Sequence, residues 1–121
     1  MRIFKNTWFD RFADREGITD YDLKSAANQL EEDQADANLG GGVYKVRVAR
    51  LGEGKSGGYR VIVFFKSREK LFFTYGFAKS DRGNIAIGEL RAFKADAKIN
   101  LSLTDDQIKE RLRKRTLVEV L

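Results

Sequence analysis

The sequence contains no cysteine, no histidine and no proline. The first two absences exclude disulfides, thiol nucleophiles, histidine general bases and zinc sites of the Cys/His type. Any catalysis must therefore use Lys, Arg, Tyr, Ser, Thr or carboxylates. Apolar runs are also short: none approaches the roughly 20 residues of a membrane span, and residues 1–20 lack the apolar core of a secretion signal. We expect a cytoplasmic protein.

The 121 residues, 42% of them hydrophobic, suffice for one compact core. We expect a single domain over residues 1–121, with a core of about 1–93 and a C-terminal helical extension of about 94–121. The 23 Lys and Arg against 18 Asp and Glu give a net charge of +5, which favours a polyanionic partner.

The first half of the chain predicts one short strand and two helices. Residues 1–4 have strand character, and a helix capped at Thr7 and ended by Gly17 follows, with Phe9, Phe12 and Ala13 on one side. A second helix begins after Thr19 or Asp20 and extends toward the three glycines at 40–42. Its apolar stripe repeats with helical spacing at Leu23, Ala26, Ala27 and Leu30.

From residue 43 the apolar period changes to two, which predicts an antiparallel meander. Its strands are residues 43–49, 59–65 and 71–75, and the two preceding helices cover one face of it. A third helix is expected over 89–101, and a Thr104–Gln107 capping box opens a basic helix through about Arg115. Residues 117–121 close the chain as a short strand.

The stretch Gly54-Lys55-Ser56 resembles the end of a phosphate-binding loop. Such a loop needs an earlier glycine where this chain has Ala49, and a helix directly after the serine. Ser56 instead leads through two glycines into a strand pattern. We therefore interpret the stretch as a hairpin connection.

Closing this hairpin symmetrically pairs Ala49 with Arg60, Arg47 with Ile62, and Lys45 with Phe64. The three cations then share the face that the first two helices do not cover, provided that the register does not slip by one residue. Few carboxylates lie nearby in the sequence, and Lys55, Lys79 and Arg82 extend the same rim. An ordinary solvated sheet face is the alternative interpretation.

Three segments together resemble the RelE/ParE/HigB superfamily of bacterial toxins, in its HigB-like RelE branch. They are Tyr44-Lys45-Val46-Arg47-Val48-Ala49-Arg50, Gly57-Gly58-Tyr59-Arg60, and the run from Phe73 through Gly76 and Lys79 to Arg82. The resemblance covers about residues 1–93. It implies an α+β, RelE-like fold with the N-terminal strand and two helices on one face of the meander, and additional C-terminal helices.

The resemblance also implies a toxin of a type II toxin–antitoxin system. Such toxins inhibit translation by cutting mRNA in the ribosomal A site without a metal or other cofactor, so the implied partners are a cognate antitoxin, the ribosome and mRNA. Lys45, Arg47, Arg60 and Lys79 match the family's basic residues. This chain departs from the best-studied member at Ser80, where that protein has an arginine, and at Ala86, where it has a tyrosine.

RNA cleavage of this kind requires a base for the 2′-OH, stabilisation of a charged phosphorane, and protonation of the leaving oxygen. Lys45, placed among other cations, is the candidate base. Arg47 and Arg60 suit phosphate clamping, and Lys79 or Arg82 suits the leaving group.

Arg50, Lys55, Tyr59 and Arg82 are the candidate RNA-binding residues, although strand parity also places Tyr59 in the core. Trp8, Phe9 and Phe12 are expected in the core. Two other functions stay open: a ParE-like, non-nucleolytic inhibitor of DNA gyrase, and a catalytically inactive RNA-binding module.

Overall fold

The structure is a computed structural model that describes residues 1–50 and 54–121, without the side chains of Arg50 and residues 54–57. Ten elements follow one another along these residues. They are β1 (Arg2–Asn6), α1 (Thr7–Glu16), α2 (Asp20–Glu31), β2 (Ala37–Gly40), β3 (Val43–Arg50), β4 (Gly54–Lys66), β5 (Lys70–Ala78), α3 (Ile87–Leu101), α4 (Asp105–Arg113) and β6 (Leu117–Val120).

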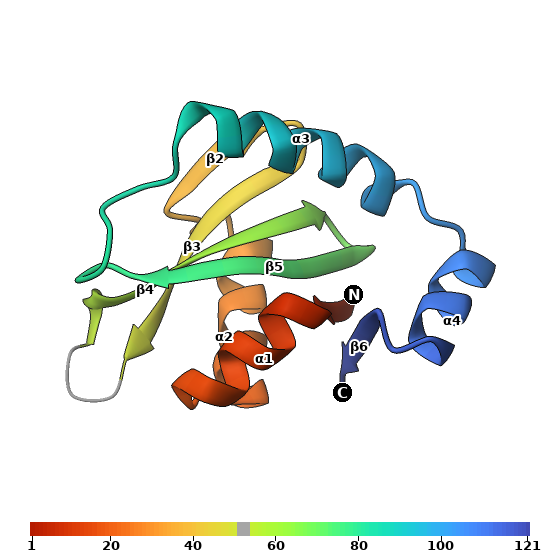
Figure 1. The fold of residues 1–121 in the computed structure, drawn as a ribbon, viewed down its shortest axis with the longest axis horizontal. Coiled ribbons are helices and arrows are strands. Elements are labelled where there is room, and N and C mark those ends of the chain that lie inside the picture. Colours follow the sequence, from red (N-terminus) through yellow and green to blue (C-terminus); the bar gives the residue numbers. More distant parts are fainter. Residues whose placement is uncertain (51–53) are drawn as a thin grey trace.

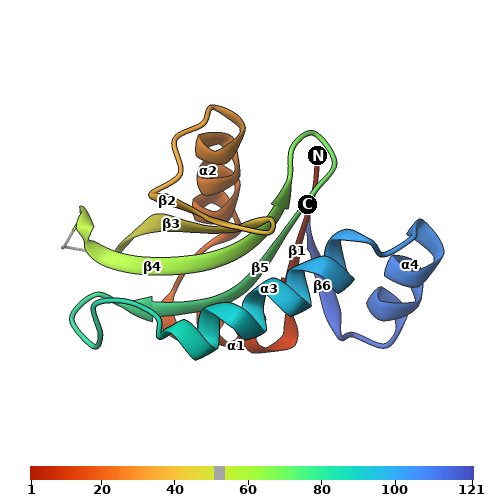
Figure 2. The same cartoon turned by 90° about the horizontal axis from the view of Figure 1, so that it is seen from above.

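The strands form one six-stranded sheet in the order β2-β3-β4-β5-β1-β6. Strands β3 to β5 are the predicted antiparallel meander, β2 extends it antiparallel to β3, and β1 pairs in parallel with β5. β6 lies antiparallel to β1, which brings the two chain termini side by side (Figures 1 and 2). The C-terminal segment therefore belongs to the same sheet as the N-terminus, and α3 runs through the expected boundary at residue 93.

Local signals explain where the first two helices begin and end. Asn6, one residue before the predicted cap, accepts a hydrogen bond from the backbone N–H of Phe9 at 2.7 Å. Gly17 ends α1 in the left-handed conformation, with φ of 72°. Thr19 and Asp22 form a capping box at the start of α2.

The prediction for residues 32–40 is wrong. α2 ends at Glu31, and β2 follows where the helix was expected to continue toward the glycines. The strand sequence Ala-Asn-Leu-Gly contains no β-branched residue, so local propensity gives little sign of it. Its strand conformation comes from pairing with β3, where Ala37 lies opposite Lys45.

Helices cover both faces of the sheet (Figure 2). α1 and α2 pack on one face, as predicted, over a core whose largest members include Phe9, Leu23, Val61, Val63, Leu71 and Phe73. A second core joins α3 and α4 to the opposite face through Phe4, Val43, Ile62, Phe64, Phe72, Ala97 and Ile108. The predicted capping box of Thr104 and Gln107 opens α4. The face expected to carry the cations is therefore shared with α3.

A close contact between β5 and α1 gives the first testable prediction. A Cβ added at Gly76 would lie 2.7 Å from Cε2 of Phe12, and the Phe12 ring is held in place by Trp8, Phe9 and Tyr59. Gly76→Ala should therefore lower the free energy of unfolding by about 1–3 kcal/mol through overpacking, as measured by urea denaturation.

Gly88→Ala is the matched control, because a Cβ there meets no atom within 4 Å. It lies in α3 and should leave the free energy of unfolding unchanged or raise it by up to about 1 kcal/mol. Equal stability of the Gly76→Ala variant and the parent chain would contradict the packing described here.

Candidate functional site

The β3–β4 register places the predicted cations on one face of the sheet. Lys45 lies opposite Ile62, and Arg47 lies directly opposite Arg60. The predicted partners are wrong by two residues, but a shift of two preserves the face on which each side chain stands. The expectation that Lys45, Arg47 and Arg60 share a face is therefore confirmed.

A β-bulge at Thr74 decides which residues of β5 join this face. Ile62 pairs with Tyr75 whereas Val63 pairs with Phe73, so Thr74 has no partner of its own in β4. Its hydroxyl donates to the carbonyl of Ile62 at 2.9 Å. The extra residue leaves Phe73 in the α1/α2 core and turns Tyr75 toward the core under α3.

The bulge also aligns the end of β5 with Arg60. Phe77 lies opposite Arg60. Beyond the strand, the N–H of Lys79 donates to the carbonyl of Gly58 at 3.1 Å, which continues the same pairing by one step. Lys79 is exposed. Strand alternation therefore places Lys79 on the face of Arg60, at the end of the sheet that leads to the β5–α3 loop.

Asp36 is a member of the site that the sequence analysis missed. One of its carboxylate oxygens lies 2.8 Å from Nε of Arg47, and the other lies 3.6 Å from Nζ of Lys45. The expectation of few nearby carboxylates is thus wrong at this position. Like charges opposite one another destabilise a sheet, and Asp36 offsets that repulsion where Arg47 stands opposite Arg60. The sequence did not indicate that Asp36 lies near Arg47, because Asp36 directly precedes β2, a strand that was not predicted.

The two arginines of the site differ in their access to solvent. The side chain of Arg47 is 45% exposed and borders an open cavity of about 410 Å³ lined by Gln29, Gln34, Ala35 and Asp36. Arg60 is only 5% exposed. Because electrostatic interactions are stronger away from water, Arg60 is the cation with the greater effect on a phosphate that reaches it.

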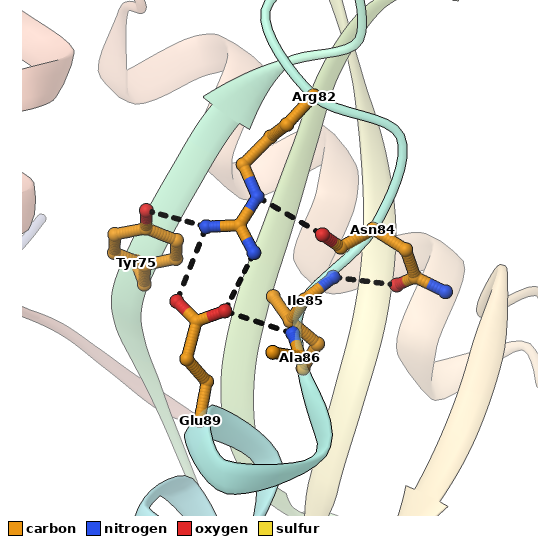
Figure 3. A network of polar contacts seen from close by, with 6 residues as sticks. All are labelled: Tyr75, Arg82, Asn84, Ile85, Ala86 and Glu89. Atoms are coloured by element: carbon orange, nitrogen blue, oxygen red, sulfur yellow. Dashed lines mark hydrogen bonds and ion pairs between the residues drawn. The ribbon is translucent and has the colours of Figure 1, made fainter.

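Arg82 is held in a polar network at the base of the β5–α3 loop (Figure 3). Its two Nη atoms donate to the two carboxylate oxygens of Glu89 at 3.1 and 2.5 Å, and Nη1 also lies 3.3 Å from the hydroxyl of Tyr75. Nε donates to the carbonyl of Asn84 at 2.9 Å. The guanidinium stands over the ring of Phe77 at 5.2 Å. Arg82, expected to bind RNA, is thus engaged within the chain.

Glu89 connects this network to the start of α3. It accepts the backbone N–H of Ala86, the N-cap residue, at 2.8 Å. The hydrogen bonds from Arg82 and from this backbone lower the pKa of Glu89 from 4.5 to about 2. Hydrogen bonding to Glu89 in turn raises the pKa of Arg82. The pair therefore stays ionised at neutral pH and ties the loop to the helix.

The aromatic predictions have mixed outcomes. Phe9 and Phe12 are buried as expected, but the prediction for Trp8 is wrong, because 43% of it is exposed. Tyr59 is 3% exposed and packs against Phe12, with its hydroxyl donating to Glu16 at 3.1 Å. That position leaves no open ring face for a base to stack on.

Two further candidates for RNA binding cannot be placed in the structure. The side chains of Arg50 and Lys55 lie outside the described part of the chain.

One comparison with known proteins identifies the family. The model of the RelE toxin of the RelE/RelB toxin–antitoxin system matches residues 1–120. The chain belongs to the RelE toxin family. It is thus the toxin of a toxin–antitoxin system, from a family whose members generally inhibit translation and are paired with a cognate antitoxin. No curated protein matches the chain.

Two searches of the described residues gave negative results. No helix of this toxin within residues 1–50 and 54–121 combines the length and apolarity needed to cross a membrane. In the same residues, no three acidic side chains gather closely enough to hold a metal ion.

The depressed pKa of Glu89 yields a pH-dependent prediction. Its carboxyl has a pKa of about 2 in the folded toxin against an ordinary 4.5. Its stabilising contribution is therefore complete above the ordinary value and is lost as the pH falls toward the folded value. The Tm of the parent toxin should exceed that of Glu89→Gln by a constant amount near neutral pH, and the two should converge in acid.

Glu32→Gln is the control for this comparison, since Glu32 is exposed at the end of α2 and forms no ion pair with any described residue. It should not change the Tm difference with pH. A Glu89→Gln variant as stable as the parent at every pH would show that the network does not hold the loop.

Proposed function

We propose that this toxin is a metal-independent endoribonuclease of the HigB-like RelE branch that cuts mRNA in the ribosomal A site. Its partners are the ribosome, mRNA and the cognate antitoxin, and it acts in the cytoplasm. One observation carries the proposal: Lys45, Arg47 and Arg60 stand on one face of β3 and β4, and Lys79 follows β5 in register with that face. RNA supplies phosphates along a flexible strand, which is the ligand that such a face attracts.

Arg60 and Arg47 are suited to stabilise the phosphorane. Neither loses its proton in a protein, and both present the planar donor fork that fits two phosphate oxygens. Arg60 acts from a buried position, where an electrostatic contact costs little reorganisation. Arg47 is aimed by its bond to Asp36, while its side chain keeps enough exposure to meet the strand.

Lys45 is the proposed general base for the 2′-OH. Only its neutral amine can accept that proton. Its Nζ lies 3.6 Å from a carboxylate oxygen of Asp36, and 15% of its side chain is exposed. Lys79, exposed at the other end of the face, is placed to protonate the leaving oxygen or to hold the next phosphate.

Dependence on the ribosome is what the resemblance to RelE toxins implies, and the composition of the described site supports it. No described side chain of the face is a histidine, because the sequence contains none, so the chemistry relies on charge and alignment. Holding an RNA strand in an attack geometry supplies several kcal/mol of the barrier. The ribosome presents mRNA in a fixed conformation and can provide that alignment to a weak acid–base site.

The first test maps mRNA ends by primer extension in cells that express the toxin. New 5′ ends inside translated codons are expected for the parent chain. Arg60→Lys keeps the buried charge but loses the planar fork, and should reduce cleavage by about 10². Lys79→Ala should reduce it less, because Lys79 is exposed.

Lys24→Ala removes one exposed positive charge from α2 and should cleave like the parent chain. Variants are compared only when circular dichroism shows the parent fold. If the parent toxin produced no new mRNA ends but caused gyrase-linked breaks in DNA, the nuclease proposal would fail in favour of a ParE-like activity. Full cleavage by Arg60→Lys would remove Arg60 from the site.

A further inference from the structure

We propose that Trp8 is a base-stacking residue for single-stranded RNA, and that Arg11 binds an adjacent phosphate. This inference rests on the proposed nuclease function, because it adds a second contact for the same RNA strand. The first contact is the sheet face with Lys45, Arg47 and Arg60, called the cation face below. The surface formed by Trp8, Arg11 and Arg15 is called the α1 platform below.

The ring of Trp8 is both exposed and rigidly supported. It is 43% exposed, stacks on Phe12 with ring centroids 5.1 Å apart, and leans on Tyr75 at 4.6 Å. Phe12 is in turn fixed in the core. A supported ring with a free surface loses little conformational entropy when a base stacks on it.

The end of β1 explains why Trp8 is exposed at this place. β1 pairs with β5 only as far as Lys5 and Phe73, so the rest of β5 has no strand on that side. α1 begins directly after β1, with Thr7. Its second residue, Trp8, packs against Tyr75 and so covers the unpaired edge of β5. Trp8 thus lies at the junction of the two faces of the sheet, where neither helical layer covers it completely.

Contacts link the α1 platform to the cation face without a break. Trp8 touches Tyr75, the hydroxyl of Tyr75 meets Arg82, and Arg82 lies over Phe77, which stands opposite Arg60. This series of contacts connects Trp8 to the residues around Arg60, so we expect one RNA strand to reach both.

The charges around Trp8 fit a polyanion. Arg11 and Arg15 lie one and two turns along the same side of α1, and both are exposed. Arg11 forms no ion pair with any described residue. Arg15 lies 3.4 Å from a carboxylate oxygen of Glu16 and over the ring of Phe12 at 5.7 Å, so Arg11 is the cation of α1 assigned to the phosphate. The nearby carboxylate of Asp10 is taken by Lys5 at 2.9 Å.

RNA fits this surface better than a protein does. Trp8 is the only exposed large hydrophobic residue of α1, because the others belong to other segments of the described chain: Met1, Tyr21, Ile87, Ile99 and Leu121. One ring flanked by cations is instead the usual combination for unpaired bases.

Trp8 is the only tryptophan of the chain, so its fluorescence reports on the platform directly. The full-length toxin is titrated with a single-stranded, 2′-O-methylated oligoribonucleotide, which cannot be cut through its 2′-oxygen. Saturable quenching is expected. Inorganic polyphosphate of equal charge, which has no bases, should not quench.

Two pairs of variants separate stacking from folding and from charge. Trp8→Leu should lower kcat/KM for ribosome-bound mRNA about tenfold, mainly through KM, whereas Trp8→Phe should stay within about threefold of the parent. Arg11→Gln should reduce the slope of log affinity against log salt by about 0.7, the value for one phosphate on a single strand. Lys24→Gln, with the same loss of charge on α2, should not.

The outcomes distinguish this inference from the proposed function. If the parent toxin cleaves mRNA, but Trp8 is not quenched and a folded Trp8→Leu cleaves equally well, the inference is overturned and the nuclease function stands. If RNA quenches Trp8 but the toxin cleaves nothing, the platform stands and the nuclease function fails. A fluorescence change with the cognate antitoxin alone, together with parent-like cleavage by Trp8→Leu, would assign Trp8 to a protein interface and overturn the inference.

Discussion

The pairing of β4 with β5 across the bulge at Thr74 determines which side chains meet at the candidate site. One extra residue in β5 places Phe73 in one core, and Tyr75 in the other core under α3. Two hydrogen bonds stabilise the bulge. The hydroxyl of Thr74 donates to the carbonyl of Ile62, and the side-chain amide of Asn6 donates to the carbonyl of Thr74 at 3.1 Å. Because Asn6 also caps α1, the same residue fixes the start of the helix that carries Trp8.

Two carboxylates organise the cations around this arrangement. Asp36 holds Arg47 and Lys45 at the β2–β3 edge, and Glu89 holds Arg82 at the β5–α3 loop. Each carboxylate forms an ion pair with an arginine and so reduces the repulsion between that arginine and nearby cations. Carboxylate oxygens accept hydrogen bonds from the guanidinium as phosphate oxygens would. Such internal counterions reduce the repulsion within a concentrated positive face, which the proposed RNA-binding function requires while no RNA is bound.

Most of the fold could be predicted from the sequence, because its elements have strong local signals. The capping residues Thr19 and Asp22 predict the start of α2, and the alternation of apolar residues after Val43 predicts β3. Strand β2 could not be found, since Ala37–Gly40 is a strand only through its pairing with β3. The shared face of Lys45, Arg47 and Arg60 was predictable from parity, which survived an error of two residues in register.

The rest of the site depends on tertiary structure that a linear pattern does not contain. The alternation of Phe73, Tyr75 and Phe77 in the sequence suggests a single face, and only the bulge divides them. Trp8 and Phe12 have the spacing of a buried helical pair, but Trp8 lies where β1 has ended and is exposed. Asp36 reaches Arg47 from the residue before β2, a strand that local propensity does not indicate. In each case a neighbour distant in sequence decides the role of the residue.

The central claim is that this face of the sheet promotes attack by an RNA 2′-OH on the adjacent phosphate. The most direct measurement uses ribosomes programmed with an mRNA that carries a single 2′-deoxynucleotide at the mapped cleavage position, compared with the all-ribose mRNA. The account predicts that the toxin cuts only the all-ribose mRNA at that position and leaves a 2′,3′-cyclic phosphate. Equal cleavage of both mRNAs, or cleavage of neither, would contradict it.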